Sequence, residues 1–263
     1  MFLINTLLLS GCNSLKVPKS SMDHTMSATP TDVIPTKSEW TITNHPNANE
    51  EIPFSILIKD KSGKPIQTFE TIHEKKMHLF IVSKDLSYFS HIHPKYKGNG
   101  EFDFTTSFPA GGDYKLISEF TPKGGGDPSV ESQWVHIDGE TAEGIPLVLD
   151  QKLTKVVNGK KVTLSFDHIM AGMTVHMNFT IRDAASNQPI KNLQPYLGAM
   201  GHAVAMSGDA EKYLHIHPMA TEGNGPKVTF MTVFPKKGIY KVWGQFQHEG
   251  QVFTVPFVIN VEN

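Results

Sequence analysis

Residues 77–94, Met-His-Leu-Phe-Ile-Val-Ser-Lys-Asp-Leu-Ser-Tyr-Phe-Ser-His-Ile-His-Pro, hold the pattern that decides the fold. An apolar run follows His78, a polar segment occupies 84–87, and a second run ends in His91-Ile-His93-Pro94. Two such runs around turn residues predict a β-hairpin. The same pattern, His-x12-His-x-His-Pro, recurs 124 residues later as His202, His215, His217 and Pro218. The chain therefore divides into two related halves.

The composition favours an all-β protein. The chain has 263 residues, with 21 Gly and 17 Pro, and its apolar residues fall in short Val-, Ile-, Phe- and Thr-rich runs. We expect two tandem immunoglobulin-like or cupredoxin-like β-sandwich domains at 37–138 and 146–263, joined by a linker at 139–146. The first should have about seven strands. Its apolar runs are 52–59, 78–83, 88–93, 101–106, 114–120 and 130–137.

A second motif also occurs in both halves. Phe108-Pro-x-x-Gly112-x-Tyr114 recurs as Phe234-Pro-x-x-Gly238-x-Tyr240. The glycine permits a turn, and the tyrosine can pack at a sandwich corner with its hydroxyl bonded locally. We expect this element to be structural.

The N-terminal residues predict export and lipid attachment. An apolar run from Phe2 to Leu9 is too short to span a bilayer as a helix, and it leads into Leu9-Ser10-Gly11-Cys12. This tetrapeptide resembles the bacterial lipobox, in which the signal is cut before the cysteine and that residue is lipidated. We expect a signal peptide at 1–11, a lipid on Cys12, and a flexible Ser/Thr/Pro/Lys-rich tether at 12–36. The alternative is a buried N-terminal segment in which the cysteine occurs by chance.

The three histidines of each half can meet on one face of a hairpin. Residues opposite each other in an antiparallel pair share a face, as do residues two apart on one strand. A two-residue loop at 84–85 would pair His78 with His91. A shift by two residues would pair His78 with His93, whereas a shift by one would move it to the opposite face. The same holds for His202, His215 and His217.

These patterns indicate metal binding, because neutral imidazole is the commonest protein metal ligand. The histidines match between the halves although their neighbours have diverged, as in Leu79–Val82 against Ala203–Met206. The alternative is that His-x-His-Pro only ends a strand, where Pro stops the pairing.

Copper is the metal that the composition favours. Three imidazoles fit zinc, cupric copper or nickel, and the only cysteine is Cys12, which excludes a blue-copper site. The chain also has 13 His and 11 Met, and thioethers suit cuprous copper. Candidate additional ligands are Met77, Met200, Met206, His168, Met170, Met173, His176 and Met177. The alternative for the methionines is ordinary core packing.

Other functional classes have less support. A net charge of −2 and a single arginine, Arg182, argue against nucleic acid as a partner. A zinc enzyme could use three histidines and a bound water, but it needs an acid–base partner. Within the span of the two motifs, the carboxylate shared at the same relative position is Asp85 with Asp209, and both fall at the hairpin turns, where Asp is an ordinary turn residue. We therefore expect no catalytic residues and no enzyme activity.

The second half resembles the bacterial YtkA-like domains. The resemblance is carried by Met200-Gly-His-Ala-Val204, by His215-Ile-His217-Pro218 and by the Phe-Pro-x-x-Gly-x-Tyr-x-Val-Trp element at 234–243. The first half looks like a diverged copy, with Met77-His-Leu-Phe80 and His91-Ile-His93-Pro94 in the matching places. The resemblance covers most of 40–263. It implies an exported β-sandwich protein related to copper or envelope stress, with no assigned reaction.

Taken together, the sequence predicts an extracytoplasmic protein, lipid-anchored to the cell membrane, that buffers, senses or delivers a metal, with copper favoured over zinc. Its partners would be the membrane, through the lipid, and other envelope or metal-trafficking proteins. The alternative is a cell-envelope interaction module that binds no metal. A third, less favoured interpretation is a zinc enzyme with a three-histidine site.

Overall fold

The computed structural model describes residues 33–220 and 222–263. In this part of the chain every helix or strand element is a β-strand, and no helix is available to span a membrane. The predicted signal peptide, Cys12 and most of the tether lie outside the described residues. The prediction of an all-β fold with two tandem immunoglobulin-like sandwiches is confirmed.

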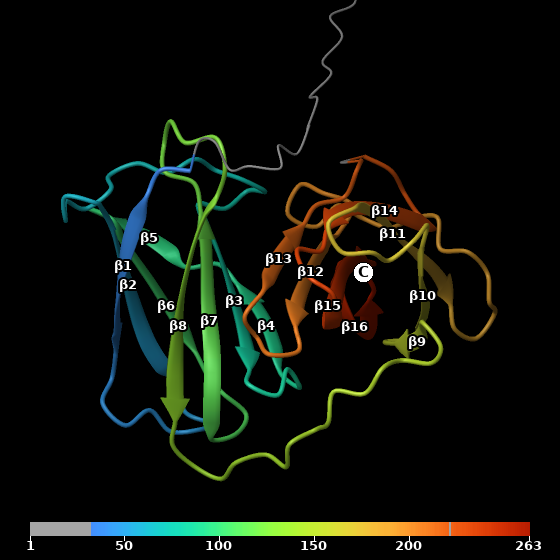
Figure 1. Ribbon diagram of the computed structural model, residues 1–263, viewed down its shortest axis with the longest axis horizontal. Coiled ribbons are helices and arrows are strands. Elements are labelled where there is room, and N and C mark those ends of the chain that lie inside the picture. Colours follow the sequence, from blue (N-terminus) through green and yellow to red (C-terminus); the bar gives the residue numbers. More distant parts are fainter. Residues whose placement is uncertain (1–32, 221) are drawn as a thin grey trace, which may run out of the picture. The chain divides into compact units, whose positions relative to one another are not determined.

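The first sandwich consists of eight strands, where about seven were expected. They are β1 (Thr36–Ile42), β2 (Ile52–Asp60), β3 (Met77–Ser83), β4 (Phe89–Ile92), β5 (Lys95–Gly98), β6 (Glu101–Thr106), β7 (Gly112–Phe120) and β8 (Ser129–Ile137). Two antiparallel sheets have the orders β1-β2-β6-β5 and β4-β3-β7-β8 (Figure 1). Each apolar run named above forms one of these strands.

The second sandwich repeats this plan. Its strands are β9 (Thr154–Val157), β10 (Lys160–Phe166), β11 (Thr174–Asp183), β12 (His202–Ser207), β13 (Tyr213–Ile216), β14 (Lys227–Val233), β15 (Gly238–His248) and β16 (Gln251–Val261). They form the sheets β14-β11-β10-β9 and β13-β12-β15-β16. The hairpin β12–β13 therefore holds the same place in its sheet as β3–β4. The matching sheets differ at opposite edges: in the first sandwich β5 is added beside β6, whose counterpart is β14, and in the second β9 is added beside β10, whose counterpart is β1.

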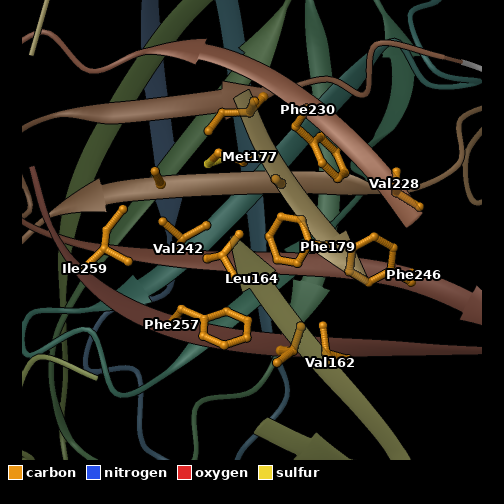
Figure 2. Close-up of a cluster of buried hydrophobic side chains, with 14 of the residues drawn as sticks. Val162, Leu164, Met177, Phe179, Val228, Phe230, Val242, Phe246, Phe257 and Ile259 are labelled. Carbon is orange, nitrogen blue, oxygen red and sulfur yellow. The ribbon is translucent and has the colours of Figure 1, made fainter. Parts of the chain in front are cut away.

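Each sandwich has its own core, built by alternation along the strands. In the second, the fully buried rings of Phe179, Phe230 and Phe257 meet between the sheets (Figure 2). In the first, Met77, Leu79 and Ile81 of β3 point into the core. The residues between them on this strand must then point to the other face of the sheet.

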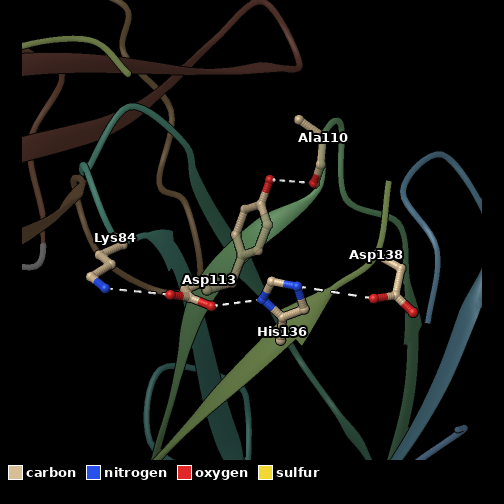
Figure 3. A network of polar contacts seen from close by, with 6 residues as sticks. Lys84, Ala110, Asp113, His136 and Asp138 are labelled. Atoms are coloured by element: carbon tan, nitrogen blue, oxygen red, sulfur yellow. Dashed lines mark hydrogen bonds and ion pairs between the residues drawn. The ribbon is translucent and has the colours of Figure 1, made fainter. Parts of the chain in front are cut away.

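The Phe-Pro-x-x-Gly-x-Tyr element has the structural role that the sequence predicted. Gly112 and Gly238 adopt φ values of 131° and 134°, in the region that favours glycine. The Tyr114 hydroxyl donates to the Ala110 carbonyl at 2.9 Å (Figure 3), and the Tyr240 hydroxyl donates to the Lys236 carbonyl at 3.0 Å. Both halves therefore close a sandwich corner in the same way.

A third apolar cluster, here called the interdomain cluster, joins the two sandwiches. Its buried members are Phe80, Val82, Leu86 and Ile117 of the first sandwich and Val204, Met206, Ala210 and Trp243 of the second. Two matching hydrogen bonds flank it, from Lys115 Nζ to the Ala210 carbonyl and from Lys241 Nζ to the Leu86 carbonyl, both at 2.7 Å. Because Phe80 and Val82 share a strand face with His78, the histidine-bearing faces of the two sheets lie against each other.

Candidate metal centre

The pairing of each hairpin brings its three histidines onto one face. Leu79 pairs with Ile92 and Phe80 with His91, which is the second of the two predicted registers and leads to His93 opposite His78. In the second hairpin, Val204 pairs with His215 in the same register. The first histidine set (His78, His91, His93) and the second histidine set (His202, His215, His217) therefore face the interdomain space.

In the first histidine set, hydrogen bonds assign the tautomers of two rings. His78 Nε2 lies 3.0 Å from the Ile72 carbonyl, so it carries the proton and its Nδ1 is left with a lone pair. His91 Nδ1 lies 2.7 Å from Gln245 Oε1, and the amide nitrogen of Gln245 donates to Thr254, so His91 Nε2 is left with a lone pair. These two lone-pair nitrogens lie 3.0 Å apart. Two acceptors at this distance repel each other unless a proton or a metal ion lies between them.

The second histidine set repeats the supporting hydrogen bonds of the first. His202 Nε2 donates to the Tyr196 carbonyl at 3.0 Å, and His215 Nδ1 donates to Glu119 Oε1 at 2.6 Å. The remaining nitrogens are His202 Nδ1 and His215 Nε2. Like Nε2 of His93 and of His217, they are buried without a hydrogen-bond partner among the described residues. A buried polar atom without a partner is costly, and histidine nitrogens of this kind are suited to a metal.

The two sets form one cluster rather than two separate sites. The ring centroids of His78 and His215 lie 5.5 Å apart, and those of His91 and His202 lie 6.0 Å apart. Each set is also supported by the other sandwich, since Glu119 of β7 holds His215 and Gln245 of β15 holds His91. Each sandwich thus supplies all three histidines of its own set, and the other sandwich supplies the acceptor that holds one of those rings.

The ligand atoms are close enough together to share ions. Those of His78, His91 and His93 lie within 4.8 Å of one another. A second group with this property is Glu119, His215 and His217, in which Glu119 stands in place of His202, whose ring centroid lies 5.7 Å from that of His215. Both groups combine buried and half-buried residues.

Three members of the cluster were not predicted from the sequence. Glu119 and Gln245 lie on strands outside the span of the histidine motifs, and they hold matching places with different residue types. His73 has its ring centroid 4.5 Å from that of His217 and 5.0 Å from that of His202. The matching residue in the second half is Leu197, so a comparison of the two halves does not identify His73.

Burial keeps the imidazoles neutral. Desolvation lowers the pKa of His93 to about 3, of His202 to about 2 and of His217 to about 3, and neighbouring imidazoles lower these values further. Desolvation also lowers the pKa of the His215 ring well below its usual value and raises the pKa of the Glu119 carboxyl. The neutral ring is the form that binds metal.

The candidate methionine ligands mostly lie in the cores. Met77 packs in the first core, and Met177 and Met200 pack in the second. Met206 belongs to the interdomain cluster. Core packing accounts for all four side chains.

The segment that includes His168 and His176 belongs to the other sheet of the second sandwich. His176 on β11 donates to Asp167 Oδ2 at 2.6 Å, and His168 Nδ1 lies 3.3 Å from Oδ1 of the same carboxylate. Met170 and Met173 are 36% and 47% exposed. His168 and His176 thus form a surface group around Asp167, and β11 belongs to a different sheet from β12 and β13.

Two other groups of acidic residues have structural roles. Asp85 Oδ1 accepts from the backbone of Ser87, and Asp209 Oδ1 accepts from that of Glu211, as expected for turn residues. Figure 3 shows Asp113 between Lys84 and His136 at the surface. The His136 side chain is 66% exposed, and exposed ion pairs contribute little to stability.

The buried rings predict that stability falls with falling pH when metal is removed with EDTA. Because the histidine pKa values are lower in the folded state, the unfolded chain takes up protons first as the pH falls through 6.5. Each ring then lowers the free energy of unfolding by up to about 1.4 kcal/mol for each pH unit below about 6.5. Glu119 acts in the opposite direction, since its raised pKa favours the protonated folded form, but it is one group against six rings.

Urea unfolding followed by far-UV circular dichroism, about one pH unit above and below 6.5, measures this effect. The His93→Gln/His217→Gln variant has two fewer titrating rings and should lose less stability across the same range. An equal free energy of unfolding at both pH values in the wild type would contradict the assignment of buried neutral rings.

Several solved structures of bacterial proteins are similar to the chain at low identity. The integrin-binding protein invasin is 12% identical with a TM-score of 0.26, over 84% of this chain and 39% of that chain. Domains 4 and 5 of the S-layer protein SbsC are 10% identical with a TM-score of 0.25, over 86% of this chain and 98% of that chain. A putative membrane-anchored protein from Corynebacterium diphtheriae is 10% identical with a TM-score of 0.25, over 86% of this chain and 59% of that chain. Similarities at this level carry no argument about function.

The sequence itself shows the family. No curated protein is significantly similar to the chain. A family model described as "Domain of unknown function (DUF8832)" matches residues 33–137 and again residues 155–263. The two matched ranges include all the strands of the first sandwich and nearly all of those of the second. The chain therefore belongs to the DUF8832 family and contains its domain twice.

Proposed function

We propose that this protein binds transition-metal ions, copper or zinc, between its two sandwiches. The ligands are the first histidine set and the second histidine set, each holding one ion. The observation that carries the proposal is the pair of lone-pair nitrogens, His78 Nδ1 and His91 Nε2, that face each other at 3.0 Å. The partnerless nitrogens of the second set support it.

The distances fit a shared ion. Imidazole nitrogens bind zinc at about 2.0–2.1 Å, so two of them on one ion lie roughly 3–3.4 Å apart for angles between a right angle and a tetrahedral one. The separation of His78 Nδ1 and His91 Nε2 is close to this range. An ion there would satisfy both lone pairs and remove their repulsion.

Burial supports binding rather than catalysis. The His78 residue is 3% exposed and His202 is 0% exposed, and the rings lie beside the interdomain cluster. A buried ion of this kind is held away from substrates, which suits buffering, sensing or delivery. Three imidazoles accept copper or zinc, and copper remains the prediction that the composition favours.

We place the protein outside the cytoplasm, attached to the membrane through a lipid on Cys12. The support is the Leu9-Ser10-Gly11-Cys12 sequence after an apolar run. The resemblance to YtkA-like domains is in keeping with this location.

A second candidate function is a cell-envelope interaction module without metal. It is favoured by the edge strand β8, where Val130 and Trp134 are 49% and 37% exposed on one face. This function predicts that replacing all six histidines leaves the binding of an envelope partner unchanged.

Metal titration of the full-length protein tests the proposal. We expect one ion per histidine set, bound more tightly than micromolar, when Cu⁺, Cu²⁺ and Zn²⁺ are each added and bound metal is counted by mass spectrometry of the intact complex. His78→Ala/His91→Ala should abolish one site and His202→Ala/His215→Ala the other, because each change removes two of three ligands.

The exposed His136 supplies a matched control, since its ring makes only surface contacts. His136→Ala should bind both ions with unchanged affinity. The proposal is wrong if the wild type binds neither metal, or if the paired substitutions bind as much metal as the wild type does.

Expression in a bacterial host tests the anchor. We expect the protein to incorporate a fatty-acid label and to fractionate with membranes, and Cys12→Ala to lose both properties. Cys12 is the only cysteine, so the label has no other thiol to modify. Equal labelling of wild type and Cys12→Ala would refute lipidation at this residue.

A further inference from the structure

The two histidine sets are supported by different chemical groups. β3 pairs His78 with Glu119, and β12 pairs His202 with Gln245, so these two residues hold the same place in the two halves. Each accepts a hydrogen bond from a histidine of the opposite sandwich, at 2.6 Å for Glu119 and 2.7 Å for Gln245. The two hydrogen bonds hold matching places, and the two acceptors differ in the charge that they can carry.

Glu119 acts on a metal through His215. Its Oε1 accepts from His215 Nδ1, and its Oε2 accepts from the Tyr213 hydroxyl at 3.2 Å. Both oxygens are thus engaged, and His215 Nε2 remains for an ion. A carboxylate behind a metal-binding imidazole fixes the ring and raises its basicity, and its negative charge offsets that of a divalent cation. The neutral amide of Gln245 fixes His91 but provides no charge.

His73 adds a second difference. The carbonyls of Ile72 and Tyr196 accept matching bonds from His78 and His202, so the two turns are equivalent in their backbones. The next residue is His73 in the first half and Leu197 in the second. The His73 ring centroid lies 5.0 Å from that of His202 and 4.5 Å from that of His217, but 6.4 Å from that of His78, so this additional imidazole lies closer to the second set than to the first. Zinc prefers four ligands.

We propose that the two sites are unequal and fill in order. The second histidine set, supported by Glu119 and flanked by His73, is the tighter site for a divalent cation and fills first. The first histidine set, supported by Gln245, is the weaker site. This inference rests on the proposed function, and it assigns Glu119 as a positioning residue that sets affinity.

Single-site forms of the full-length protein separate the two affinities. His93→Ala leaves the second set intact and His217→Ala leaves the first, and zinc affinity is measured by competition with a chromophoric chelator. We expect the His93→Ala form to bind zinc at least about tenfold more tightly than the His217→Ala form does. Adding Glu119→Gln to it should weaken binding by about 10- to 100-fold, because the amide keeps the hydrogen-bond acceptor and loses the charge. Adding His73→Leu to the His93→Ala form introduces the residue that the second half has at this place, Leu197, and it should also weaken zinc binding.

The reverse substitution excludes a purely structural explanation. Gln245→Glu in the His217→Ala form should tighten the first site by about tenfold or more, a gain that damage to the fold cannot produce. Far-UV circular dichroism checks that each variant is folded. If Glu119→Gln does not fold, Gln245→Glu alone decides the question.

The outcomes distinguish the inference from the proposed function. Two zinc ions bound with equal affinity, or no response to Glu119→Gln and Gln245→Glu, would overturn the inequality and leave metal binding standing. Absence of both zinc and copper binding by the wild type would overturn both. Ordered filling that is lost in Glu119→Gln and moved to the first set by Gln245→Glu would establish the inference.

Discussion

The need to satisfy buried imidazole nitrogens governs the centre of this molecule. Two sheets pack their outer faces together, and the apolar part of that contact is the interdomain cluster. Beside it, six histidines are desolvated, and four of their nitrogens have no hydrogen-bond partner among the described residues. An apolar interface gains nothing from such atoms, because each one costs free energy unless a proton or a metal ion satisfies it. Metal binding gives this arrangement a physical reason.

The local pattern was sufficient to predict each sandwich. Alternation along β3 and a turn at 84–87 predicted the hairpin, and the choice between two registers was left open because both keep the histidines on one face. The packing of the two sheets was not predicted. The run Leu79–Val82 is apolar at every position, as is 203–206, and this is typical of a strand covered on both faces. The apolar run indicates that both faces of the strand are buried, but it does not show which part of a protein packs on the outer face.

The residues that support the histidines could not be found by the repeat alone. The six histidines and the corner tyrosines are identical in the two halves, so the repeat identifies them. It misses Glu119, whose counterpart is Gln245, and His73, whose counterpart is Leu197. These are the positions where two equivalent sites can acquire different affinities. In a duplicated protein, the differences at matched places can thus carry as much functional information as the similarities.

A crystal structure of the zinc-soaked protein, with anomalous data at the zinc edge, would show whether the buried histidines bind metal. We predict an ion bound by His78 Nδ1, His91 Nε2 and His93 Nε2, and a second bound by His202 Nδ1, His215 Nε2 and His217 Nε2, with bonds of about 2.0–2.1 Å. Anomalous peaks only at surface histidines, with the buried rings bonded to water, would contradict it.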